Sequence, residues 1–394
     1  MWVKGKTHKN EVIKYLLNLT TTVVNIGFIY AIYAYHFYNN SVLEFNSVVL
    51  VTTILNISEI IIDFGRRHNI NKSIINDNSY RSPITINLFI NSLFSLPLYL
   101  VLYSKGVNPD FISCLCLVLF YNTCDPLITV IRSQELFLLE LLVSLISKAC
   151  ILFCYFYFDD CNYLDALGAG FALRFILILL YDFLGKKQIT TLLTTSTKDY
   201  NFLKQANAKI FMNNGFSAII TRSPLIIISS LRNEALKYQL NSICLVANLL
   251  NIVTSCIFPI LYNKICSKNH DYFFLLKKIY LVLALTYFAV VHITFYLLTG
   301  SQFGYLLTKY LGNNPTRFIT ILVLIAILQN WNLLDRLKVI VGNQVTSDNT
   351  FYALYILILL IFCNFTSLPV VFLFITILIL ESMHYVYRNI FLNL

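Results

Sequence analysis

Hydrophobic positions along the chain form long, nearly continuous runs, unlike the alternating segments of about 10 residues that are typical of a membrane β-barrel. A helix needs about 20 mainly apolar residues to cross a bilayer, and runs of this kind recur over almost the whole length. They predict twelve transmembrane helices, at residues 12–36, 42–64, 84–105, 110–131, 136–157, 163–184, 206–230, 236–262, 274–299, 317–338, 350–367 and 369–390. The predicted fold class is therefore an all-α polytopic membrane protein.

One stretch of the pattern occurs twice. The chain reads "NSVVLVTTILNI" at 46–57 and "NSICLVANLLNI" at 241–252, and seven of the twelve paired residues are identical at an ungapped offset of 195. The same offset aligns "KYLLN", which ends at Asn18, with "KIFMN", which ends at Asn213. Apolar bias explains matches of Leu and Val, but it does not easily place asparagines and a lysine in register. We therefore predict an internal duplication.

The duplication divides the twelve helices into two sets of six. We predict an N-terminal lobe at 1–184, a cytoplasmic linker at 185–205 and a C-terminal lobe at 206–394. Because six is even, both sets start on the same side of the membrane, so the repeats are parallel and related by an axis along the membrane normal. Residues 14–184 are expected to superpose on 209–390 span for span, with a substrate site between the lobes.

Composition and charge fix the environment of the helices. With 58% hydrophobic and 12% charged residues, the chain is excluded from the soluble globular class. Its net charge of +10 comes from basic residues in alternate connections. The opposite connections carry only Lys105, Arg232, Lys237, Lys309 and Arg317. The positive-inside rule then places both termini in the cytoplasm, and orientation in the membrane accounts for the basic charge without a nucleic-acid partner.

Polar residues follow one face of two helices that the repeat aligns. In the first copy the polar residues are spaced by 4, 3 and 4, and they are Thr52, Asn56, Glu59 and Asp63. In the second copy the spacings are 3 and 4, and the residues are Asn248, Asn251 and Ser255. Such stripes serve either as hydrogen bonds between helices or as a hydrated inward face. We expect Thr52, Asn56, Asn248 and Asn251 to line the interface between the lobes.

Ionisable residues near the middle of a span are costly and need a partner or a wet cavity. They are Asp125, Lys148, Arg174 and Arg222. Asp125 can pair with Lys148 or Arg174, whereas Arg222 aligns with the neutral Gly27 and precedes Pro224, which is expected to bend its helix. Arg222 is expected to point into a central cavity, or else to extend toward the external headgroups. The candidate translocation residues are Arg222, Arg174, Lys148, Asp125, Asn18, Asn213, Asn56 and Asn251.

The chain has no nucleotide-binding glycine-rich loop, no H-E-x-x-H motif and no clustered histidines or cysteines, so we expect neither an enzyme nor a metal site. Its second span ends in "IIDFGRR" (61–67), and residues 220–261 read "ITRSPLIIISSLRNEALKYQLNSICLVANLLNIVTSCIFPIL". Together these stretches resemble the O-antigen flippases of the Wzx type, within the multidrug/oligosaccharidyl-lipid/polysaccharide (MOP) flippase superfamily. Arg222, Tyr238, Phe258 and Pro259 fit the family pattern, but Ser223 stands where the family has an acidic residue.

The resemblance implies a V-shaped pair of six-helix lobes around a cationic cavity in the inner membrane of a bacterium. It implies a flippase that moves an undecaprenyl-diphosphate-linked oligosaccharide from the cytoplasmic to the periplasmic leaflet. The expected partners are this lipid-linked oligosaccharide, the membrane lipids, and a polysaccharide polymerase with its chain-length regulator. No cofactor is expected, and the coupling ion, H⁺ or Na⁺, stays open because of Ser223.

Two alternatives remain at this point. A multidrug exporter of the sister branch, of the MATE type, would share the fold. A membrane O-antigen polymerase or ligase would share the size and the helix count, but such enzymes typically carry a long external loop with basic catalytic residues. The longest external connection here, at 300–317, is short, which favours a transporter.

Overall fold

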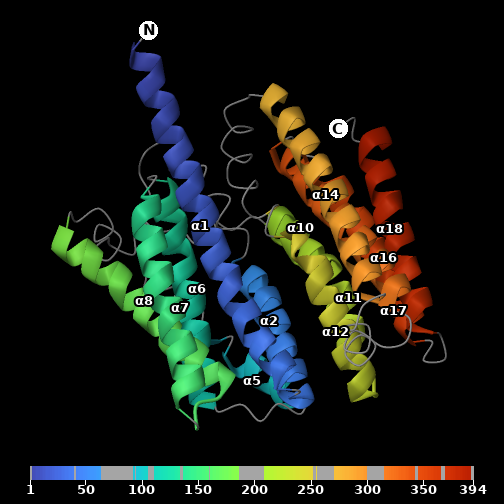
Figure 1. The fold of residues 1–394 in the computed structure, drawn as a ribbon, viewed down its shortest axis with the longest axis horizontal. Coiled ribbons are helices and arrows are strands. Elements are labelled where there is room, and N and C mark those ends of the chain that lie inside the picture. The colour runs from blue at the N-terminus through green and yellow to red at the C-terminus, as the bar shows by residue number, and fades with distance from the viewer. Residues whose placement is uncertain are drawn as a thin grey trace. The chain divides into compact units, whose positions relative to one another are not determined.

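The computed structural model describes most of the predicted spans. The residues it describes are 2–39, 41–63, 92–93, 95–104, 111–133, 136–158, 160–185, 208–251, 254, 270–299, 315–341, 345–364 and 369–391. These residues form helices and the connections between them, which confirms the all-α class (Figure 1). The predicted linker at 185–205 lies, apart from its first residue, outside this part of the chain.

The helices fall into a first series and a second series along the chain. The first comprises α1 (Trp2–Tyr38), α2 (Val42–Asp63), α5 (Ser95–Ser104), α6 (Phe111–Ser133), α7 (Phe137–Tyr157) and α8 (Tyr163–Gly185). The second comprises α10 (Ala208–Thr221), α11 (Ser223–Ser229), α12 (Glu234–Asn248), α14 (His270–Thr299), α16 (Pro315–Val341), α17 (Val345–Asn364) and α18 (Val370–Phe391).

Length and composition make the described helices a membrane bundle. Six of them carry segments long and apolar enough to span a bilayer: Leu16–His36, Phe137–Tyr157, Tyr163–Tyr181, Phe273–Thr299, Thr316–Arg336 and Val370–Ile390. Shorter apolar segments lie in α2, α5, α6 and α17. On α14 most apolar side chains are exposed, as expected for a helix that faces lipid. The chain is thus a multi-pass membrane protein.

The chain divides into two compact units, residues 1–38 with 54–211, and residues 39–53 with 212–394. In the first unit α8 packs on α6 and α7, and α6 also packs on α5. In the second unit α18 packs on α16 and α17, and α16 also packs on α14. Three helix pairs that the repeat aligns are therefore in contact in both units, whereas, among the described residues, α1 packs on α7 only in the first unit and α12 packs on α16 only in the second. The start of α2 belongs to the second unit, which the sequence did not lead us to expect.

Local sequence explains where several helices begin. Asn233 caps α12, because its Oδ1 accepts a hydrogen bond from the Leu236 amide at 3.0 Å. At the start of α8, Asn162 Oδ1 accepts from the Asp165 amide at 3.0 Å, and Asp165 Oδ2 accepts from the Asn162 amide at 3.4 Å. This reciprocal pair is a capping box with aspartate in place of glutamate. Both caps lie at helix starts that face the predicted external side.

Close packing between α7 and α8 depends on Gly170. A Cβ atom at this position would overlap the Ile151 side chain and would lie 2.9 Å from the Ser147 carbonyl oxygen. Small residues of this kind let membrane helices approach each other closely. We expect Gly170→Ala to lower the free energy of unfolding by about 1–3 kcal/mol, because the added methyl group would overpack the contact between α7 and α8.

Thermal unfolding of the purified protein in detergent measures this loss. Gly215→Ala is the matched control, because no atom lies within 4 Å of its added Cβ and alanine favours a helix by about 1 kcal/mol over glycine. The interpretation is wrong if both variants unfold at the same temperature.

Candidate functional site

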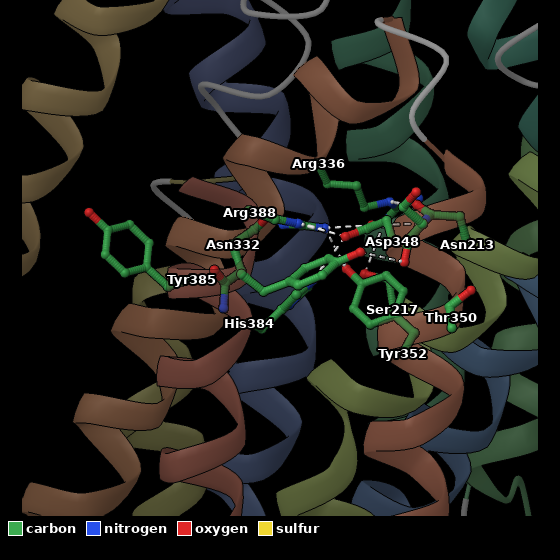
Figure 2. A network of polar contacts seen from close by, with 12 residues as sticks. Asn213, Ser217, Asn332, Arg336, Asp348, Thr350, Tyr352, His384, Tyr385 and Arg388 are labelled. Carbon is green, nitrogen blue, oxygen red and sulfur yellow. Dashed lines mark hydrogen bonds and ion pairs between the residues drawn. The ribbon is translucent and has the colours of Figure 1, made fainter. Parts of the chain in front are cut away.

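A buried polar network joins four helices of the second unit (Figure 2). Its centre is Asp348 of α17, whose side chain is fully buried. Arg388 of α18 binds this carboxylate with two parallel bonds, from Nε to Oδ1 at 2.8 Å and from Nη2 to Oδ2 at 2.7 Å. His384 Nε2 lies 2.9 Å from Oδ1, and Asn213 Nδ2 of α10 donates to Oδ2 at 2.8 Å. Both carboxylate oxygens are thus doubly satisfied, which a buried charge requires.

The remaining donors of Arg388 extend the network to α16. Its Nη1 donates to the Asn332 carbonyl oxygen, and its Nη2 donates to the Tyr352 hydroxyl at 2.9 Å. The Asn332 amide in turn donates to Glu381 Oε2 at 2.6 Å, and the Tyr355 hydroxyl donates to Glu381 Oε1 at 3.3 Å. A guanidinium without solvent contact therefore has an acceptor for each of its nitrogens.

A second arginine, Arg336 of α16, faces α10. Its Nε donates to Asn213 Oδ1 at 2.7 Å, its Nη1 to Ser217 Oγ at 3.1 Å, and its Nη2 to Asn214 Oδ1. Asn213 therefore connects Arg336 to Asp348, whereas Tyr385 of α18 points away from the cluster (Figure 2). Asn213, predicted from the repeat, is the one predicted site residue in this network.

The network lies near one end of the bundle. Asp348 is three residues from the start of α17, and Arg388 is three residues from the end of α18, which is about 5 Å along each helix. In the predicted topology these ends face the cytoplasm. On the same side, Lys277 of α14 pairs with Asp335 of α16 at 2.5 Å and lies 4.3 Å from the Trp331 ring centre. Most charges in this region are therefore paired within the protein, which is typical of a structural core.

Most of this network lies outside the predicted set of site residues. The eleventh span is predicted to start at residue 350, whereas α17 begins at Val345 and includes Asp348. The spacing of Glu381, His384 and Arg388, by 3 and 4, places them on one polar face of a helix, which is the signal in the sequence that indicates the network.

Arg222 occupies a break in the seventh span. Helix α10 ends at Thr221 and α11 begins at Ser223, so the helix is interrupted at Arg222, two residues before Pro224. Proline has no amide hydrogen to offer the Ile220 carbonyl. Ser223 Oγ donates to that oxygen at 2.7 Å, and Gln329 Nε2 of α16 donates to it at 2.9 Å. Ser223 and Gln329 thus both stabilise the break.

These two donors predict a non-additive effect on stability. Gln329→Leu or Ser223→Ala alone should cost less than about 1 kcal/mol, because the other donor remains. The double variant leaves a buried carbonyl unsatisfied and should cost about 1–3 kcal/mol. Thermal unfolding of the three variants tests this, with Ser382→Ala as a control on an exposed hydroxyl. The assignment would be contradicted if the double variant lost no more stability than the two single variants lose together.

The Arg222 side chain is half-buried, and among the described residues it makes no ion pair and no side-chain hydrogen bond. Arg174 of α8 is also half-buried, and its Nε has no hydrogen-bond partner in the described chain. Lys148 of α7 is buried, with Nζ 4.1 Å from the Phe28 ring centre and 4.4 Å from that of Phe171. Arg174 and Lys148 both lie near the buried Cys124 of α6.

The other predicted residues are dispersed. Asn18 is buried on α1, and Asn56 is half-buried on α2. Asn251 accepts a hydrogen bond from Asn330 Nδ2 of α16 at 2.6 Å, so it links two helices of the second unit. Asp125 lies on α6, but its side chain is outside the described residues, and so is its predicted pairing. The structure therefore does not bring the predicted set together as one site.

Comparison with known proteins identifies the fold. No protein-family model matches the chain, and no curated protein matches it. The eukaryotic MATE transporter AtDTX14 superposes with a TM-score of 0.65 at 14% identity, over 98% of this chain and 96% of that one. A MOP superfamily transporter from Pyrococcus furiosus gives 0.64 at 11% identity, over 95% and 93%. An outward-facing multidrug resistance MATE transporter gives 0.63 at 10% identity, over the same shares.

The chain is thus a polytopic α-helical membrane protein with the fold of MOP superfamily transporters. The likeness covers nearly the full length of both chains in each comparison. The three matched proteins named above are described as transporters.

Proposed function

We propose that the protein is an alternating-access flippase for an oligosaccharide linked to a polyprenyl diphosphate. The proposal rests on one observation about Arg222. This arginine lies within a membrane span, its side chain is half-buried, and it makes no ion pair with the described residues. Arg174, on α8, has the same character. Arginine within a membrane needs hydrogen-bond acceptors, a charged partner or a wet cavity, and its planar fork matches the geometry of phosphate oxygens.

The contrast with the paired charges supports this choice. Arg388 and Lys277 both have a carboxylate partner within the protein, so they have no need of a substrate. A transported diphosphate would supply the partner that Arg222 and Arg174 lack. A sugar head would bind to amide and hydroxyl groups, which are dense in these spans.

The remaining parts of the proposal follow from the sequence. We place the protein in the inner membrane of a bacterium, with both termini in the cytoplasm and with movement from the cytoplasmic to the periplasmic leaflet. The lobes are proposed to be residues 1–184 and 206–394, and the cycle is driven by H⁺ or Na⁺ without a cofactor. A polysaccharide polymerase and its chain-length regulator would act on the product.

Removal of the gene tests the proposal in cells. Lipid-linked oligosaccharide should then accumulate on the cytoplasmic leaflet, and surface polysaccharide should be lost. If surface polysaccharide is unchanged and the cells become sensitive to cationic drugs, the protein is a multidrug exporter instead. The fold is equally consistent with that second function, since the multidrug MATE transporter shares it. Unpaired arginines argue against it, because they would repel a cationic drug.

A further inference from the structure

Three cysteines lie together at one end of the first unit. Cys150 and Cys154 lie on α7, where their sulfur atoms are 3.9 Å apart, and Cys161 lies in the connection between α7 and α8. All three side chains are half-buried, whereas Cys114 and Cys124 are fully buried. The described residues contain no group with the geometry of a metal site. Oxidation is the chemistry that remains for thiols within reach of solvent.

The connection folds back toward the end of α7 through two consecutive turns. The Phe158 amide donates to the Cys154 carbonyl oxygen at 3.3 Å, and the Cys161 amide donates to the Phe158 carbonyl oxygen at 3.0 Å. Cys161 directly precedes Asn162, which caps α8, the helix that packs on α7. Burial, the Asp165 carboxylate and the Cys154 thiol raise the pKa of Cys161, and the last effect reflects the proximity of the two thiols.

Helix geometry decides which two thiols can join. A disulfide needs Cβ atoms about 3.5–4.5 Å apart, whereas residues four apart on a helix keep theirs about 5–6 Å apart. Cys150 and Cys154 therefore cannot join without distorting α7. Cys161 lies outside both helices, so its backbone is free to move toward Cys154. Cys154 is also three residues from the end of α7, about 5 Å along the axis, which makes it the thiol nearer the membrane surface.

We propose that Cys154 and Cys161 form a disulfide bond that ties the end of α7 to the start of α8, while Cys150 stays reduced. The proposal rests on the proposed topology, in which this connection faces the periplasm, an oxidising compartment. It does not depend on the solute that the protein carries.

The oxidant is a thiol oxidoreductase in its disulfide form. The Cys161 thiolate attacks this disulfide and displaces one carrier sulfur, which gives a mixed disulfide. The Cys154 thiolate then attacks the Cys161 sulfur and displaces the second carrier sulfur. Two thiols of this protein are thus oxidised, the carrier disulfide is reduced, and the two protons pass to the carrier thiols.

Alkylation of a single tryptic peptide tests the bond. Trypsin cleaves after Lys148 and Arg174, and the peptide 149–174 contains these three cysteines and no others. Cells are quenched in acid, and the denatured protein is alkylated with or without prior reduction. Mass spectrometry should find one alkylated cysteine in this peptide without reduction and three after it. Chymotrypsin cleaves between Cys154 and Cys161, and the two fragments should stay linked until they are reduced.

Variants identify the bonded pair. Cys154→Ser and Cys161→Ser should each leave two cysteines in the peptide that react without reduction. Cys116→Ser, at a half-buried cysteine of α6, is the matched control and should keep a single reactive cysteine in the peptide. Three reactive cysteines in the unreduced wild-type peptide would overturn the proposal. A bond between Cys150 and Cys154 would overturn it as well.

The side of the membrane is measured separately. A variant that keeps Cys161 as its only cysteine is treated in intact spheroplasts with a membrane-impermeant maleimide, and Cys161 should be labelled. If Cys161 is labelled but the wild type shows no bond, the topology stands and the disulfide proposal is wrong. If Cys161 is not labelled, the proposed topology is wrong, and the disulfide proposal fails with it.

Discussion

Replacing Asp348 by alanine is expected to lower the free energy of unfolding by about 3–5 kcal/mol, the range found when one partner of a buried ion pair is removed. Arg388 is fully buried, and Asp348 provides its only ion pair in the described chain. Without the carboxylate, the guanidinium would keep only the Asn332 carbonyl and the Tyr352 hydroxyl as acceptors. The yield of folded protein and its thermal unfolding in detergent measure the loss.

A compensating variant separates the lost pair from lost packing. Asp348→Ala/Arg388→Met removes both charges, and replacing a buried pair by apolar side chains is often neutral. We expect this double variant to recover most of the stability. Glu44→Ala, at an exposed carboxylate on α2, should change stability by less than about 0.5 kcal/mol. If the double variant is as unstable as Asp348→Ala alone, the loss of stability does not come from the unpaired charge of Arg388.

Replacing Arg222 by alanine is expected to reduce transport about 10- to 100-fold at normal membrane insertion. This is the fall expected from losing a hydrogen-bonded contact between charged groups, worth about 1.5–3 kcal/mol. Arg222→Lys should retain part of the activity, because lysine binds phosphate as a point charge without the planar fork. Surface polysaccharide in complemented deletion cells provides the readout.

Arg232→Ala is the matched control, since Arg232 is exposed in the turn between α11 and α12. It should leave transport within about twofold of the wild type, as is usual for an exposed charge. Full activity of Arg222→Ala would remove the main support for an anionic substrate. Loss of activity together with loss of insertion would instead assign Arg222 to folding, like Asp348.

The pattern of apolar residues predicted the helices well, because a helix that crosses a bilayer needs about 20 mainly apolar residues. The break at Arg222 was also predictable, since Pro224 removes a donor from the helix. That Gln329 repairs the break was not, because this residue is 109 positions away along the chain. The "TSDN" segment at 346–349 resembles a loop, yet it is helical because tertiary partners satisfy Asp348.

The repeat pointed to two asparagines, Asn46 and Asn241, but not to the hydrogen bond between them. Sequence identity aligned Asn46 with Asn241, and it could not tell that the two side chains meet. The environment of a charge near the end of a span was also not predictable. Arg388 lies near a span end, where an arginine usually extends toward the lipid headgroups. Its burial depends on the carboxylate of another helix.

Translocation in liposomes tests the central claim most directly. Purified protein is reconstituted with a fluorescent polyprenyl-diphosphate oligosaccharide, and a membrane-impermeant quencher is added outside. We predict that the inner-leaflet pool becomes accessible with the wild-type protein and stays protected with Arg222→Ala or without protein. The account is contradicted if the pool stays protected with the wild type, or if a fluorescent phosphatidylcholine without the diphosphate crosses equally fast.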